Sequence, residues 1–184
     1  MTLTKTPICK YGEKALNFNL LSVENKMINL DDVKGKNGLI IMFICNHCPY
    51  VKAVIKDIVE DANYLKDIGI NSVAIMSNDV KNYPEDSFDN MITFSKQYNF
   101  SFPYLIDKSQ LIAKTYGAVC TPDFFGYNKN LELQYRGRIK ELKNLKPTSS
   151  NESELRMAMK LIKKTGKGPT NQIPSMGCSI KWFK

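Results

Sequence analysis

The segment 38–44 (GLIIMFI) constrains the fold more than any other part of the sequence, because it is glycine followed by six apolar residues. A strand of this kind has no polar face, so both of its faces must be covered, as in the central strands of α/β sheets. Residues 51–65 then repeat apolar side chains at helical spacing, and Gly69 is placed to end that helix. A second apolar segment follows at 71–77 (NSVAIMS). The order predicts two adjacent parallel strands joined by a helix.

The rest of the chain also alternates between strand patterns and helix patterns, which predicts a single α/β domain over residues 1–184. Its core is expected at about 13–164, followed by a Gly- and Pro-rich extended tail at 165–184. Further strands are expected at 15–20, 26–30, 102–106, 123–127 and 131–138, and further helices at 87–98, 109–116 and 152–164. The first two of these strands form an expected N-terminal β-hairpin, and the last two form another. Asn151 followed by Glu154 predicts the cap of the last helix.

Composition limits the class of protein. Hydrophobic residues make up 43% and charged residues 24% of the 184 residues, the balance of a soluble globular chain. No run approaches the roughly 18 apolar residues that span a bilayer, and the N-terminal segment lacks the apolar core of a secretion signal. We therefore expect a cytoplasmic protein without a membrane partner. The net charge of +8 is spread along the chain, so no nucleic-acid partner is expected.

Residues 43–51 (FICNHCPYV) hold two of the five cysteines and the only histidine. A thiol reacts as the thiolate, which a helix N-terminus and a nearby cation stabilise. Cys45, His47 and Cys48 lie between the predicted strand and helix, where open α/β sheets place their sites. Two cysteines at this spacing allow one sulfur to attack a disulfide while the other resolves the mixed disulfide.

The start of the helix decides which sulfur the helix dipole favours, and two starts are open. If Cys48 is the capping residue, Pro49 takes the first helical position and the dipole acts mainly on Cys48. If Asn46 is the cap, Cys45 lies just outside the helix as an exposed nucleophile. On the second alternative we predict that Cys45 is the more exposed and more acidic sulfur, with Cys48 shielded behind it.

FICNHCPYV, on a strand–turn–helix, resembles the active site of the thioredoxin superfamily. Cys120-Thr121-Pro122 followed by Phe124-Phe125 resembles the cis-proline loop that those proteins hold opposite their cysteines. The order of elements is similar to the peroxiredoxin-like (AhpC/TSA-type, redoxin) branch, and the tail sequence SMGCSIKW resembles uncharacterised members with a C-N-H-C-P motif. The resemblance implies a thioredoxin-like fold: a central mixed sheet flanked by helices, with a cis peptide before Pro122.

Three positions depart from the patterns of these families. Cys45 stands where peroxiredoxins carry a threonine, whereas Cys48-Pro49 matches their reactive Cys-Pro. Peroxiredoxins also carry an arginine near the site on a later strand, and at the corresponding loop this chain has Cys120-Thr121-Pro122. Leu39 occupies the place of a buried acid in thioredoxins. The chain therefore looks like a thioredoxin dithiol on a peroxiredoxin-like frame.

The resemblance implies a thiol–disulfide oxidoreductase that uses no cofactor or metal. Cys45 would attack a protein or small-molecule disulfide, Cys48 would resolve it, and His47 would stabilise the thiolate. Thr121 and Pro122, with Cys120 beside them, would hold the substrate chain. A thioredoxin or glutathione system would return the dithiol to its reduced form.

Two alternatives stay open. One is a thiol peroxidase, in which Cys48 attacks a hydroperoxide and Cys45 resolves the sulfenic acid. The other is a non-enzymatic metal-holding or redox-sensing module with Cys45, Cys48, His47 and Cys120 as ligands. Cys9 and Cys178 are expected to be structural, and Cys120 an inert buried thiol.

Overall fold

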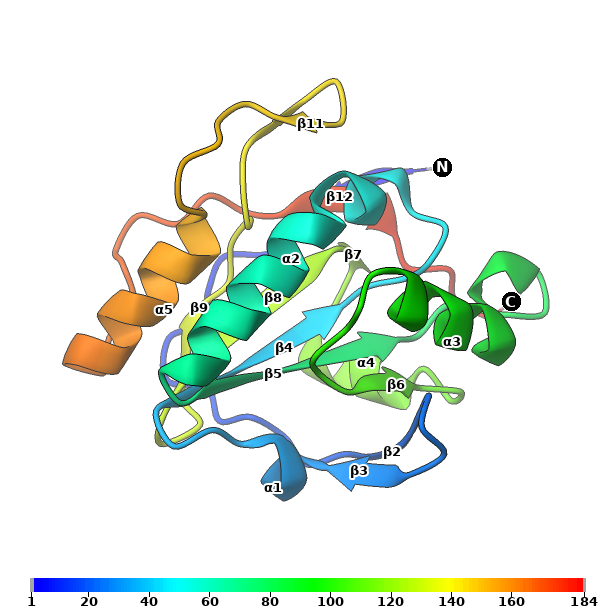
Figure 1. Cartoon of the computed structure of the whole chain (residues 1–184), viewed down its shortest axis with the longest axis horizontal. Coiled ribbons are helices and arrows are strands. Elements are labelled where there is room, and N and C mark those ends of the chain that lie inside the picture. The colour runs from blue at the N-terminus through cyan, green and yellow to red at the C-terminus, as the bar shows by residue number, and fades with distance from the viewer. Residues whose placement is uncertain (1, 184) are drawn as a thin grey trace.

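The structure, a computed structural model, describes residues 2–183 and is built on a seven-stranded mixed sheet (Figure 1). In spatial order the strands are β3 (Met27–Asn29), β2 (Asn19–Ser22), β6 (Tyr104–Ile106), β5 (Ile70–Met76), β4 (Gly38–Phe43), β8 (Asp123–Asn128) and β9 (Leu133–Tyr135). β4 and β5 are adjacent and parallel, as the apolar segments predict. Within residues 2–183, no helix combines the length and the apolar character needed to cross a membrane.

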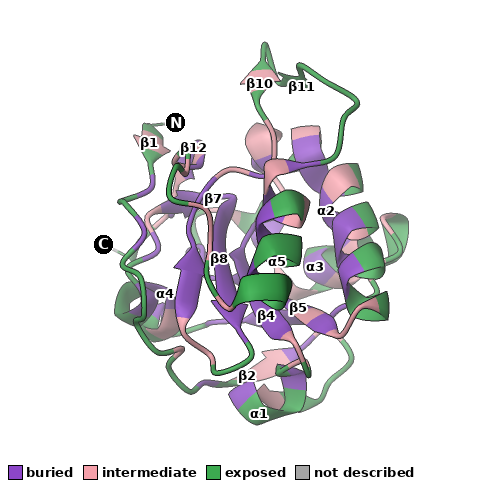
Figure 2. Cartoon of the chain, turned by 90° about the vertical axis from the view of Figure 1, so that its left-hand side faces the viewer, coloured by how far each residue is buried: buried purple, intermediate pink, exposed green. Residues whose placement is uncertain are grey.

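Helices cover both faces of this sheet, because the side chains of β4 alternate between two apolar clusters. Ile40 and Met42 belong to one cluster, and Leu39 and Ile41 belong to the other. The first cluster includes residues of α2 (Pro49–Asp67), α3 (Phe88–Gln97) and α5 (Glu154–Thr165). The second includes residues of α1 (Leu30–Val33) and α4 (Leu111–Tyr116). Figure 2 shows the buried central strands between exposed helix surfaces.

The thioredoxin-like fold expected from the resemblance is confirmed, with shifted boundaries. The expected N-terminal hairpin is the antiparallel pair β2–β3, and it begins at Asn19 rather than at Ala15. The second expected hairpin is β8–β9. The chain also contains a short hairpin of β10 (Leu142–Lys143) and β11 (Lys146–Pro147), which no sequence pattern indicates.

The cap of the last helix differs from its prediction. Ser153, and not Asn151, is the N-cap of α5, and its side chain accepts a hydrogen bond from the Arg156 N–H. The Ser153 hydroxyl also donates to the buried carboxylate of Asp61 in α2, which accepts from the Arg156 side chain as well. Packing against α2 thus selects the capping residue, and the local pattern misses this contact.

A second sheet of three short strands lies at the edge of the domain that carries the cysteines. It has the order β1 (Leu3–Lys5), β12 (Met176–Ser179) and β7 (Cys120–Thr121), and both pairings are antiparallel. Figure 1 shows β12 and β7 beside the start of α2. Part of the segment expected to be an extended tail, Met176–Ser179, is therefore held as the middle strand of a sheet.

We expect Ser153→Ala to lower the free energy of unfolding by about 1–3 kcal/mol, because it removes a helix cap and leaves the buried Asp61 without one donor. Urea denaturation checks this value. Asn151→Ala is the matched control: Asn151 is exposed, and its substitution is expected to change the stability by less than about 0.5 kcal/mol. A larger effect at Asn151 than at Ser153 would contradict the observed cap.

Candidate active site

The cysteine pair lies at the junction of β4 and α2. Cys48 is the N-cap of α2 and Pro49 is its first residue, so the first of the two predicted helix starts is correct. Cys45 follows the end of β4 in the turn between strand and helix. Both residues are buried, with 1% of Cys45 and none of Cys48 exposed. The site therefore presents no open sulfur at the surface.

The register of the sheet brings the proline loop to the cysteines. β4 and β8 pair along their whole length, and Phe43 lies opposite Asp123, so Pro122 is adjacent to the turn after β4. The Thr121–Pro122 peptide is cis, as the resemblance implies. The Thr121 hydroxyl lies 3.4 Å from Cys45 Sγ, and the Cys48 thiol donates to the Thr121 carbonyl oxygen at 3.1 Å. Thr121 thus contacts both sulfurs.

His47 is held by a buried carboxylate that no sequence pattern singles out. Asp86 belongs to the 3-10 helix η1 (Pro84–Asp86), and its Oδ2 lies 2.6 Å from His47 Nδ1. Its other oxygen accepts from the backbone N–H groups of Asn46 and His47. Asp86 raises the pKa of His47, mainly through this hydrogen bond. The sequence offered one signal for Asp86, which is its position: the loop after β5 leaves the sheet at the same edge as the turn that carries Cys45.

Hydrogen bonds extend from Asp86 in two directions. The Asn78 side chain donates to Asp86 Oδ2 at 2.8 Å and accepts from the Lys181 backbone N–H at 2.9 Å. Asn46 donates to the Glu85 carbonyl oxygen and accepts from the hydroxyl of the buried Tyr104. The turn between the cysteines is therefore fixed by a network of side-chain and backbone groups from four other segments, and Asn46 serves this network instead of capping α2.

Cys48 is the acidic sulfur of the pair. A hydrogen bond from the Cys45 thiol is the largest cause that lowers the pKa of Cys48 to about 5, and the Thr121 side chain adds to it. The backbone N–H groups of Val51, in the first turn of α2, and of Cys178 stabilise the same thiolate. Burial acts in the opposite direction and is outweighed.

The prediction that Cys45 is the more acidic sulfur is wrong, and both sulfurs are buried. Burial raises the pKa of Cys45 well above its ordinary value, and the nearby charges of Asp86 and Cys48 raise it further. His47 Nδ1 lies 3.9 Å from Cys45 Sγ, but the same nitrogen contacts Asp86, whose negative charge offsets the benefit of the imidazolium. Cys48 is therefore the more acidic sulfur of the pair.

The other three cysteines of the chain are also buried. Cys120 lies on β7 with its sulfur 3.8 Å from the Pro122 carbonyl oxygen, and burial raises its pKa strongly. Cys9 belongs to the opposite apolar cluster, and burial raises its pKa to about 11. Cys178 lies on β12 opposite Thr121, in the same cluster as Cys45 and Cys48.

Among the side chains of residues 2–183, one group could hold a metal ion. A sulfur, a ring nitrogen and a carboxylate oxygen of Cys45, His47 and Asp86 lie within 4.8 Å of one another. This set differs from the ligands expected from the sequence, because Asp86 replaces Cys48 and Cys120. Hydrogen bonds among the three groups account for their approach without an ion.

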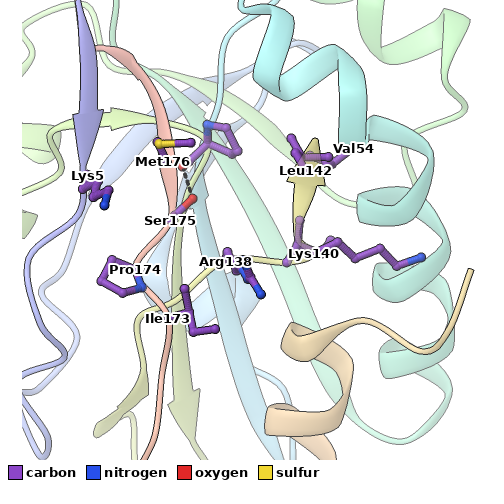
Figure 3. A pocket seen from close by; sticks show the side chains of 11 residues that line it. Lys5, Val54, Arg138, Lys140, Leu142, Ile173, Pro174, Ser175 and Met176 are labelled. Atoms are coloured by element: carbon purple, nitrogen blue, oxygen red, sulfur yellow. Dashed lines mark hydrogen bonds between the residues drawn. The ribbon is translucent and has the colours of Figure 1, made fainter. Parts of the chain in front are cut away.

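A cavity of about 240 Å³ opens beside Pro122 on the side of α2 (Figure 3). Val54 of α2 and Met176 of β12 line it together with Pro122. Ser175 donates from its hydroxyl to the Pro122 carbonyl oxygen at 2.7 Å, which fixes the chain leading into β12 against the proline loop. The cavity thus lies next to the site, with β12 as one wall.

We expect Cys45→Ala to raise the pKa of Cys48 by about one to two units, since a hydrogen bond to a charged group contributes roughly 1.5–3 kcal/mol. The rate of alkylation by iodoacetamide as a function of pH measures this shift. Cys45→Ser is the matched control, because its hydroxyl can still donate to the thiolate, and its profile should stay close to a midpoint of about 5. Identical profiles for the alanine and serine variants would contradict the assigned cause.

We expect His47→Ala to raise the pKa of the Cys48 thiol and to make the disulfide harder to reduce, because the imidazolium and this thiolate attract each other. Redox titration against glutathione measures the second effect. Tyr83→Leu removes the ring stacked on His47 at 5.7 Å while keeping the imidazolium, so it serves as the control. Equal midpoints for wild type and His47→Ala would refute an electrostatic role for His47.

The chain is similar over most of its length to proteins of known structure or sequence. A solved structure of an uncharacterised conserved protein from Geobacillus kaustophilus superimposes with a TM-score of 0.91 at 38% identity, covering 100% of this chain and 97% of that one. The thiol-disulfide oxidoreductase ResA of Bacillus thuringiensis is 31% identical over 131 residues, which are 69% of each chain. A putative peroxiredoxin, bcp, of Coxiella burnetii is 26% identical over 62% of this chain and 71% of its own.

The family comparison covers the part of the chain that carries the dithiol and the proline loop. Residues 11–142 match the AhpC/TSA family, and this range contains Cys45, His47, Cys48 and Thr121. Strand β12 lies outside it. The match spans well over half of the chain, and the protein belongs to the AhpC/TSA family.

Proposed function

We propose that this protein is a thiol–disulfide oxidoreductase in which Cys48 attacks the substrate disulfide and Cys45 resolves the mixed disulfide. The observation that carries the proposal is the acidity of Cys48 at the N-terminus of α2, beside a second thiol that hydrogen bonds to it. The relative named as a thiol-disulfide oxidoreductase supports the same reaction class. The order of attack is the reverse of the one expected from the resemblance.

The reaction balances with the residues present. The Cys48 thiolate attacks one sulfur of R–S–S–R′, a mixed disulfide forms on Cys48, and R′–S⁻ leaves. The Cys45 thiol then loses its proton to the departing thiolate and attacks Cys48 Sγ, which releases R–S⁻ and leaves a Cys45–Cys48 disulfide. The Thr121 hydroxyl lies beside Cys45 and can donate to its thiolate as it forms. A reductant such as a thioredoxin or glutathione system closes the cycle.

A peroxidase is the second candidate, and the position of the acidic sulfur favours it. Cys48-Pro49 matches the reactive Cys-Pro of peroxiredoxins, and one relative is named a putative peroxiredoxin. Arg136, however, forms a buried ion pair with Asp123 at 2.9 Å and donates to the Gly117 carbonyl oxygen. An arginine engaged in this way is poorly suited to polarise a peroxide, which supports disulfide exchange as the main activity.

Protein or small-molecule disulfides are the proposed substrates, and the cytoplasm remains the proposed location. Since both sulfurs are buried, a substrate reaches Cys48 only after a local opening of the site. A small-molecule disulfide needs a smaller opening of the site than a protein disulfide does.

We expect Cys48→Ser to reduce disulfide exchange to the background rate, whereas Cys45→Ser still attacks through Cys48 and forms a substrate adduct there. Incubation with oxidised glutathione, followed by peptide mass spectrometry, locates the adduct. The same variants treated with hydrogen peroxide test the second candidate through a sulfenic acid on Cys48. Cys9→Ser, which changes a buried thiol of the opposite cluster, is the control. An adduct on Cys45 in the Cys48→Ser variant, formed as fast as in wild type, would overturn the order of attack.

A further inference from the structure

The strand β12 occupies the edge of β7 where a substrate chain would be expected to pair. Met176–Ser179 runs antiparallel to Cys120–Thr121, with Cys178 opposite Thr121 and Ser179 opposite Cys120. A peptide that binds by strand addition uses an open edge of this kind. Here the chain fills the edge with its own segment, and that segment carries a cysteine opposite the residue that contacts both site sulfurs.

The side chain of Cys178 faces the dithiol. Successive side chains of a strand point to opposite faces, so Met176 and Cys178 share one face. Met176 lines the cavity formed with Val54 of α2 and with Pro122, which places this face toward α2. Cys178 is 3% exposed and belongs to the same apolar cluster as Cys48. The Cys178 thiol and the Cys48 sulfur also hydrogen bond, which contributes to raising the pKa of Cys178 to about 12, after burial as the main cause.

A glycine permits the close approach of β12 to the proline loop. A Cβ atom on Gly177 would lie 2.0 Å from the Thr121 carbonyl oxygen and 3.2 Å from Pro122 Cδ. The Cys48 thiol donates to this same carbonyl oxygen. The residue next to Cys178 is therefore packed against the atom that positions Cys48, and any larger side chain at position 177 would push the strand away.

We propose that Cys178 is a second resolving thiol for Cys48, presented by β12 in the position of a substrate cysteine. The proposal rests on the proposed function, since it requires Cys48 to form a mixed disulfide. It adds a redox role for a residue outside the C-x-x-C motif and outside the family match.

The exchange keeps atoms and electrons balanced. When Cys48 carries a mixed disulfide with R, the Cys178 thiolate attacks Cys48 Sγ, a Cys48–Cys178 bond forms, and R–S⁻ leaves with the proton that Cys178 gave up. Cys45 can then attack Cys48 Sγ, which moves the disulfide to Cys45–Cys48 and returns a thiol at position 178. Cys48 has no negative charge while it is in a disulfide, so its effect on the acidity of Cys178 is absent at the moment of attack.

The test uses the Cys45→Ser variant of the full chain, in which the usual resolving thiol is missing. Ellman's reagent is the probe, because its small aromatic disulfide releases coloured thionitrobenzoate at each step. Attack by Cys48 releases one thionitrobenzoate, and attack by Cys178 on the adduct releases another. Peptide mass spectrometry then identifies the linked residues.

We expect Cys45→Ser to show the second release and a peptide pair joined through Cys48 and Cys178. Cys45→Ser/Cys178→Ser should show the first release only and keep the thionitrobenzoate on Cys48. Cys45→Ser/Cys9→Ser is the matched control and should behave as Cys45→Ser. Cys45→Ser/Gly177→Ala keeps the thiol but displaces its strand, so its second release should be slower by on the order of tenfold, while circular dichroism verifies that the variant is folded.

The outcomes separate this proposal from the proposed function. If the second thionitrobenzoate is released equally with and without Cys178, or if a disulfide joins Cys48 to Cys120, the role of Cys178 is overturned. Either result leaves the dithiol mechanism in place. A complete lack of adduct on Cys48 in every variant overturns both.

Discussion

The burial of β4 on both faces is the constraint from which the remaining structure follows. With six apolar or glycine residues and no polar side, β4 must lie inside the sheet, and it pairs along its whole length with β5 on one side and β8 on the other. The pairing with β8 places Asp123 opposite Phe43, so the proline loop begins where β4 ends. The cysteines follow β4 directly. Their approach to Thr121 is thus a result of strand register.

Patterns within short stretches of the sequence predict most of the central sheet and its helices. The apolar segments at β4 and β5, the stripe of α2 and the two hairpins each carry their own signal, and the C-x-x-C motif locates the dithiol. The local capping pattern of Asn151 and Glu154 indicated the wrong helix cap, because Ser153 is a second short polar residue before the same helix. Contacts with Asp61 and Arg156 decide the cap, and those belong to tertiary structure.

The parts of the site that could not be predicted come from short segments paired over long distances in sequence. β7 and β12 have two and four residues, and their pairing joins segments more than fifty positions apart. Asp86 lies in a single turn of helix with no periodic pattern. The relative acidity of the two sulfurs is likewise a balance between burial and the number of donors around each. Cys48 has donors from Cys45, Thr121 and two backbone groups, whereas Cys45 faces the charge of Asp86.

The pairing of β1 with β12 has a consequence for how the domain opens. Leu3 and Cys178 are separated by almost the whole described chain, so this pairing closes one of the longest loops in the fold and gains only three residue pairs. Contacts of such high sequence separation form late in folding, because loop closure costs entropy before the contacts repay it. Short pairings at an edge also belong to the low-stability end of the native state, and they open without global unfolding. The three-stranded sheet is therefore expected to be a separate cooperative unit that exchanges its amide hydrogens earlier than β4 and β5 do. The buried thiols would then meet solvent at a rate set by the opening of this unit, while the rest of the domain stays folded.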